Sequence, residues 1–205
     1  GHRLVVGTPN GGVYPFDVDY ALWDATSDTE ITDAPTMLYA RAVGPMVIGM
    51  FADGTIGTFD PHTGAVVANR IDLPATPHTS TATRDGSHLA LGYDDGTVAV
   101  YEVATGRETG HLTVTGAHGE AIPIQELDLS DDASTVYVAG FGLWAFDIAT
   151  GRQLAHDSDD ALSSVALGPP GTIVVGRVDG TIAVFDAETL VEIRSLPGAG
   201  GFAQF

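Results

Sequence analysis

Five stretches of the chain share one arrangement of apolar and polar residues. Each has an apolar run, a tight turn and a second, alternating run that ends in an aromatic residue followed by an acid. The clearest copy is IVVGRVDGTIAVFD at residues 173–186, and the others cover residues 4–17, 47–60, 89–102 and, two residues shorter, 136–147. Short alternating runs joined by a tight turn are typical of β-hairpins. The pattern therefore predicts five hairpins.

The spacing of the five copies indicates a repeat protein. The aromatic-acidic pairs are separated by 43, 42, 45 and 39 residues, which is the period of β-propeller blades. The pairs are Phe16-Asp17, Phe59-Asp60, Tyr101-Glu102, Phe146-Asp147 and Phe185-Asp186.

Turn dipeptides support the hairpins. The sequence places Asn10-Gly11, Asp53-Gly54, Asp95-Gly96 and Asp179-Gly180 between the two runs of four copies. These dipeptides tolerate positive φ and favour two-residue hairpin turns. The fourth copy has Phe141-Gly142 instead.

Each hairpin has a further strand on either side in the pattern. Apolar runs precede four of the hairpins, at residues 37–43, 79–83, 124–130 and 162–168, and short polar runs follow most of the aromatic-acidic pairs. No stretch predicts a helix. We therefore expect an all-β fold, a β-propeller of about five four-stranded antiparallel blades formed by residues 3–205. Gly1 and His2 are expected to be a processing or cloning remnant. Two arrangements remain open: a ring closed by residues 201–205, or an arc of a larger propeller.

The chain resembles the WD-repeat family of propellers. The resemblance is strongest at TGAHGEAIPIQELDLSDDASTVYVAG (residues 115–140), and the Asp-Gly turns and Phe-Asp endings extend it over most of the chain. It implies that Asp53, Asp95 and Asp179 are turn acids that hold hairpins together, and that His118 is a structural residue between blades. The Trp-Asp dipeptide of that family is replaced here by Phe-Asp or Tyr-Glu.

A second resemblance is to quinoprotein-type repeat propellers, whose enzymes bind a redox quinone and a metal. It is carried by VVGRVDGTIAVFDAET and VYVAGFGLWAFDIATGRQL. Those repeats usually close with a Trp after the Thr-Gly turn, whereas Trp23 and Trp144 lie elsewhere in this chain.

The charge and composition of the chain exclude several classes of binding partner and site. The chain has 27 acidic residues against 8 arginines, a formal net charge of -19, so phosphate repulsion argues against nucleic acid. No apolar run approaches the roughly 20 residues that cross a bilayer, and we expect no membrane partner. The absence of cysteine removes disulfides, thiol catalysis and thiolate metal sites.

Motifs for catalysis are missing. There is no Gly-x-Ser-x-Gly elbow and no P-loop, and the seven histidines are scattered without a pairing that suits a metal. The acid pairs follow no calcium-loop pattern. We therefore predict no catalytic residue, no metal ligand and no cofactor.

The function predicted on this basis is a non-catalytic protein-interaction or sensor scaffold. By resemblance it would belong to a larger bacterial signalling or regulatory protein of the cytoplasm, and would bind a protein partner or other segments of that larger chain. The expected contact residues are Asp53, Asp95, Phe141, Asp179 and His118, with Trp144 either an exposed anchor or packed between blades. The alternative is an enzyme or ligand-binding propeller, quinoprotein-like or a glycosidase, with its site in the central channel.

Overall fold

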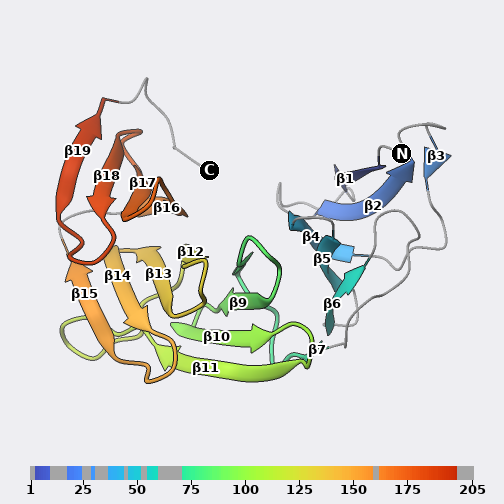
Figure 1. Cartoon of the computed structure of the whole chain (residues 1–205), viewed down its shortest axis with the longest axis horizontal. Helices are drawn as coiled ribbons and strands as arrows, with labels where there is room; N and C mark the ends of the chain where they lie inside the picture. Colours follow the sequence, from blue (N-terminus) through green and yellow to red (C-terminus); the bar gives the residue numbers. More distant parts are fainter. Residues whose placement is uncertain are drawn as a thin grey trace. The chain divides into compact units, whose positions relative to one another are not determined.

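A computed structural model describes residues 3–9, 18–24, 29–30, 37–43, 46–51, 55–59, 71–158 and 162–197. All regular secondary structure in these ranges is β-strand (Figure 1). No helix that could span a membrane was found among the residues described. The chain divides into two compact units: residues 1–76 with 84–87 and 103–107, and residues 77–83, 88–102 and 108–205. Each unit is considered by itself.

The first unit holds one seven-stranded sheet with the order β1-β2-β4-β5-β6-β7, in which β3 pairs with β2. Its last four strands follow one another in antiparallel pairs, as the repeat predicts for one blade. The strands are β1 (Arg3–Pro9), β2 (Val18–Asp24), β3 (Thr29–Glu30), β4 (Met37–Val43), β5 (Met46–Phe51), β6 (Thr55–Phe59) and β7 (Ile71–Asp72).

The first predicted hairpin differs from the structure in its second strand. β1 pairs with β2, from Arg3 opposite Asp24 to Pro9 opposite Val18, whereas the sequence pattern placed the partner strand before Asp17. Asn10-Gly11 and Phe16-Asp17 lie outside the described residues.

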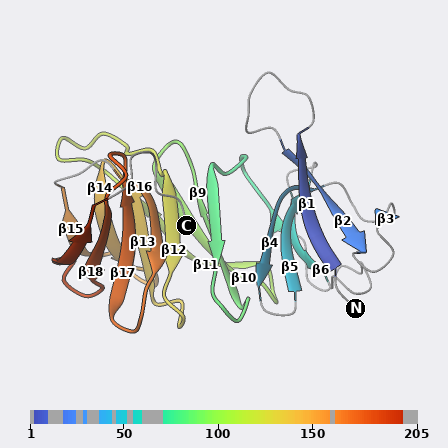
Figure 2. The same cartoon turned by 90° about the horizontal axis from the view of Figure 1, so that it is seen from above.

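The second unit contains three four-stranded antiparallel sheets, each with its strands in sequence order (Figures 1 and 2). Each sheet is one predicted repeat: a strand, a hairpin and an outer strand. The strands are β8 (Thr79–Ala82), β9 (His88–Gly92), β10 (Thr97–Glu102) and β11 (Arg107–Thr113); β12 (Glu126–Leu129), β13 (Thr135–Gly140), β14 (Gly142–Asp147) and β15 (Gln153–Asp157); and β16 (Leu162–Leu167), β17 (Thr172–Arg177), β18 (Ile182–Asp186) and β19 (Glu192–Leu196).

The aromatic residues that define the repeat occupy the same register position in all three sheets. Tyr101 lies opposite Leu89, Phe146 opposite Val136, and Phe185 opposite Ile173. The sequence period therefore corresponds to a structural period, and the predicted propeller blades are confirmed.

The middle sheet is buried on both faces. Val136, Val138, Trp144 and Phe146 belong to an apolar cluster shared with the preceding sheet. The alternate residues of the same two strands, Tyr137, Ala139, Leu143 and Ala145, belong to a second cluster shared with the following sheet. Successive side chains of a strand point to opposite faces, so one apolar run joins both neighbours.

Candidate partner-binding face

The β9–β10 turn is a three-residue loop. Tyr93 N–H donates to Thr97 O at 2.9 Å, and Gly96 N–H donates to Tyr93 O at 3.1 Å. Gly96 has φ 81°, whereas Asp95 is not among the residues with positive φ. The loop is therefore a type I turn followed by a left-handed glycine. The predicted two-residue turn is wrong, because it would need positive φ at both Asp95 and Gly96 and only Gly96 has it.

The β17–β18 turn repeats this geometry. Arg177 N–H donates to Thr181 O at 2.9 Å, Gly180 N–H donates to Arg177 O at 2.9 Å, and Gly180 has φ 84°. Its acid is Asp179, whose Oδ1 accepts a hydrogen bond from Thr181 N–H at 2.8 Å.

Asp95 makes the same bond as Asp179. Its Oδ1 accepts from Thr97 N–H at 2.9 Å. Hydrogen bonds to the Thr97 backbone and hydroxyl lower the pKa of Asp95, and those to Thr181 lower the pKa of Asp179. Both acids therefore hold turns as charged carboxylates. Asp53, the third predicted turn acid, lies outside the described residues.

An ordered loop follows β11 and carries His118. Thr115 and Ala121 form an isolated bridge, and Gly116 N–H donates to Glu120 O at 2.8 Å. His118 N–H donates to Glu120 Oε2 at 3.0 Å. His118 itself is exposed, so its side chain faces solvent, whereas a structural residue packed between blades was expected.

This loop lies between two hairpin ends. On one side, Val114 N–H donates to Gly96 O at 2.8 Å. On the other, a Cβ on Gly140 would lie 3.2 Å from Pro123 O and 3.3 Å from Ile122 Cγ2. The β9–β10 turn (93–97), the loop 115–121 and the β13–β14 tip (140–142) are therefore neighbours. We call these three segments the contact face.

Phe141 occupies the β13–β14 tip alone. Gly140 and Gly142 pair with each other across the hairpin, and Phe141 is 68% exposed. Gly142 has φ 154°, and a Cβ there would lie 2.8 Å from Asp157 O and 3.0 Å from the Trp144 ring. The backbone of the tip is closely packed while its aromatic side chain faces solvent.

Trp144 is a core residue and not an exposed anchor. It is 2% exposed and lies in the cluster between the first and second sheets. Its ring stacks on that of His156, with centroids 4.7 Å apart and an interplanar angle of 11°. Of the two aromatic residues predicted at the interface, Phe141 is the one whose ring is exposed.

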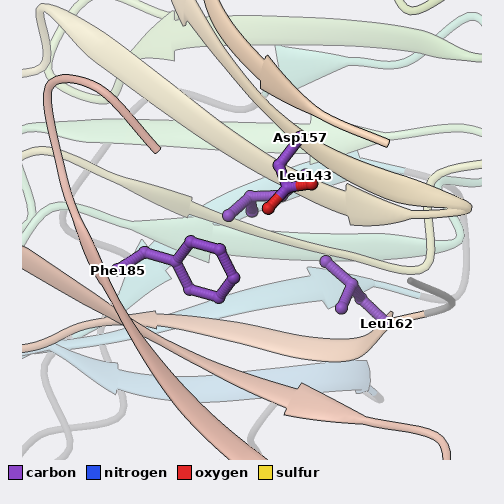
Figure 3. Close-up of a pocket in the computed structure, with 4 residues that line it drawn as sticks. All are labelled: Leu143, Asp157, Leu162 and Phe185. Carbon is purple, nitrogen blue, oxygen red and sulfur yellow. The ribbon is translucent and has the colours of Figure 1, made fainter. Parts of the chain in front are cut away.

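The Asp179 turn lies at the corresponding end of the third sheet. Leu143, next to the tip, is opposite Asp157, and Leu162 is opposite Arg177 at the start of the turn. Leu143, Asp157, Leu162 and Phe185 line one recess between the second and third sheets (Figure 3). The recess has no room even for a water molecule, so it does not resemble a small-molecule site.

Carboxylates on the inner strands join neighbouring sheets. Thr79 Oγ1 donates to Glu126 Oε1 at 2.9 Å, and Thr81 Oγ1 donates to Asp128 Oδ1 at 2.9 Å. Asp128 Oδ2 also accepts from Leu167 N–H on β16 at 2.8 Å. Asp128 therefore bonds to both flanking sheets.

Two of the repeat acids hold turns that were not predicted from the sequence. Asp147 Oδ1 accepts from Thr150 N–H at 2.8 Å and from Thr150 Oγ1 at 2.6 Å. Asp186 accepts both corresponding bonds from Thr189 at 2.8 Å. These bonds lower the pKa of each carboxyl. The Asp-x-x-Thr spacing in DIATG and DAETL would have indicated these turns.

The described residues show no site for the metal of a quinone enzyme. No three His, Asp or Glu side chains among them are placed to hold a metal ion. The inner carboxylates Glu126 and Asp128 accept hydrogen bonds from neighbouring sheets.

Comparisons with known proteins agree with the fold. The chain is similar to the crystal structure of the computationally designed Ika8 protein, with a TM-score of 0.70 and 20% identity. The match covers 99% of this chain and 62% of that one, so this chain spans less than two thirds of its length. At this identity the likeness shows the fold alone. No curated protein sequence matches the chain.

A family profile identifies the repeat. The profile PQQ_2, described as "Outer membrane protein assembly factor BamB", matches residues 1–195. This match supports the quinoprotein-type resemblance, the second of the two drawn from the sequence, and not the WD-repeat resemblance. The chain belongs to the PQQ_2 family of quinoprotein-like repeat propellers.

Proposed function

We propose that the protein is a non-catalytic interaction scaffold that binds a protein partner through the contact face. The observation that carries this proposal is Phe141, an aromatic side chain 68% exposed on a closely packed hairpin tip. Rigid aromatic groups supply much of the binding energy of protein interfaces. The neighbouring loop 115–121 and the β9–β10 turn add backbone and polar groups around it.

The use of the other polar residues supports a scaffold. Asp95 and Asp179 bond to backbone N–H groups of their own turns. Glu126 and Asp128, on the strands where a channel site of an enzyme or ligand-binding propeller would lie, bond to neighbouring sheets. These groups have structural partners, which weakens the alternative of a channel enzyme.

The family description gives independent support. It names an assembly factor, a protein that acts with other proteins. A role within a larger bacterial signalling or regulatory protein, and a cytoplasmic location, stay predictions. The family description also names the outer membrane, so the cell envelope is the competing location. Fractionation of the source cells with an antibody to this chain distinguishes the two.

Site-specific photo-crosslinking tests the scaffold. A benzophenone amino acid replaces Phe141, and in a matched control it replaces Ile193, which is 59% exposed on β19. Irradiation in the source cell should give a discrete protein adduct from position 141 and not from position 193. If the two positions give the same adducts, or neither gives any, the proposed face is wrong.

A further inference from the structure

The contact face also indicates the chemistry of its partner. Resting on the proposed function, we propose that the face binds a basic, arginine-containing segment of a protein whose apolar or guanidinium groups pack on Phe141. Three observations carry this inference: the charge of the face, the exposure of its aromatic residue and an arginine–aromatic contact elsewhere in the molecule.

The charge of the face is uniformly acidic. The segments 93–97, 115–121 and 140–142 contain Asp94, Asp95 and Glu120 but none of the eight arginines, and the chain has no lysine. The Asp94 side chain is 81% exposed, and its ion pair with His78, at 3.1 Å, joins two exposed groups. Complementary charge gives an interface its specificity and speeds association.

The exposed ring of Phe141 indicates a second property of the partner. The 68% exposed ring gains free energy when an apolar group covers it, and an aromatic face also attracts a guanidinium. The chain itself contains such a contact, because Arg177 Cζ lies 5.8 Å from the centroid of the Phe185 ring. An arginine-containing segment thus satisfies the acids and the ring together.

Other occupants fit less well. A second copy would bring another chain of net charge -19 to the same acidic face, and nucleic acid would bring phosphate. Both are repelled at long range. A basic protein segment is the occupant that the charge favours.

Fluorescence anisotropy tests the inference with defined probes. The probes are a short fluorescein-labelled peptide that alternates Arg and Leu, the same peptide with Glu in place of Arg, and the same peptide with Ser in place of Leu. The Arg-Leu peptide should bind most tightly, and added salt should weaken its binding. Equal binding of all three peptides would overturn the proposal.

Variants separate this face from the general negative charge of the chain. Asp94→Arg and Phe141→Ser should each raise the Kd of the Arg-Leu peptide by about tenfold. Glu188→Arg makes the same charge reversal at an exposed position of the β18–β19 turn and should leave the Kd within about twofold. Thermal melts establish that all three variants are folded.

If Glu188→Arg weakens binding as much as Asp94→Arg, attraction is non-specific and the inference fails. Failure of this inference can be distinguished from failure of the scaffold proposal. A protein adduct from position 141, together with no preference for the basic peptide, would leave the scaffold standing and remove the basic partner. Absence of the adduct would remove the scaffold itself.

Discussion

Ala133 and Leu190 are the residues other than glycine with positive φ in the described part of the chain, each at φ 53°. Ala133 follows Asp132 in the β12–β13 turn, and Gly86, at φ 72°, follows Asp85 in the β8–β9 turn. Leu190 N–H donates to Asp186 O in the turn after β18, as Gly151 N–H donates to Asp147 O after β14. Both residues thus hold positions where another repeat has glycine.

Ala133→Gly should stabilise the protein by about 0.5–1 kcal/mol. Removing Cβ relieves about 1–2 kcal/mol of left-handed strain, and part of this gain is offset by the greater freedom of glycine in the unfolded chain. Urea unfolding followed by circular dichroism measures the difference.

Leu190→Gly is the matched control. The Leu190 side chain is 3% exposed and lies in the cluster between the second and third sheets, so losing it should cost about 2 kcal/mol or more despite the relief of strain. A destabilising Ala133→Gly would contradict the positive φ at that position.

The acids at the ends of β14 and β18 should make stability depend on pH. The pKa of Asp147 and of Asp186 is lowered by hydrogen bonds from Thr150 and Thr189. The unfolded chain then binds more protons than the native one between the lowered pKa and the ordinary value near 4. This stability is fully present above the ordinary value and is lost as pH falls through the lowered pKa.

The double variant Asp147→Asn, Asp186→Asn should therefore lose less stability than the wild type between neutral pH and pH about 3. Urea midpoints at both pH values give the comparison. Identical pH dependence in the two proteins would mean that these hydrogen bonds do not favour the charged carboxylates.

At the scale of the strands, Asp128 ties β12 to β8 and β16. Asp128→Ala removes the acceptor of Thr81 Oγ1 and of Leu167 N–H, and should destabilise the protein by about 1–3 kcal/mol. Thermal or urea unfolding measures the loss.

A double-mutant cycle identifies the Thr81 bond. Thr81→Val in the Asp128→Ala background should cost less than Thr81→Val alone, because the hydroxyl has already lost this acceptor. Additive costs would show that the two side chains do not interact energetically.

The strands could be predicted more reliably than their junctions. The interval between aromatic-acidic pairs located the hairpins at Phe146 and Phe185, since a repeated sequence period implies a repeated structural unit. The turn type at Asp95 was not predictable from its dipeptide, because Asp-Gly suits both two- and three-residue loops.

The contact face was predictable only in part. Phe141 was recognisable because it replaces the Asp of the turn dipeptide, and His118 because of its place in the WD-like segment at residues 115–140. Their proximity, however, depends on how Gly140 packs on Ile122 and Pro123. The burial of Trp144 could not be predicted, because the sequence of an irregular hairpin does not show which of its two faces packs against a neighbouring sheet. The bonds of Asp128 join residues 39 and 47 positions apart, and no local pattern indicates them.

At the scale of the whole molecule, the net charge of -19 opposes folding. With 27 acids and 8 arginines, like-charge pairs greatly outnumber ion pairs, and compaction brings them closer together. Salt shortens the range of this repulsion, from about 10 Å at 0.1 M to about 3 Å at 1 M. Sodium chloride should therefore stabilise the protein.

We expect the melting temperature to rise by about 2–4 °C for each 1 kcal/mol of repulsion that salt removes. Ion pairs such as Arg177–Glu192, at 2.7 Å, act in the opposite direction, but the chain has only 8 arginines to pair with its 27 acids. Equal rises in sodium chloride and potassium chloride, measured by scanning calorimetry, would identify screening as the cause. A melting temperature that falls with salt would mean that attractive pairs outweigh the repulsion, and the acidic contact face would then attract a basic partner less than its sequence suggests.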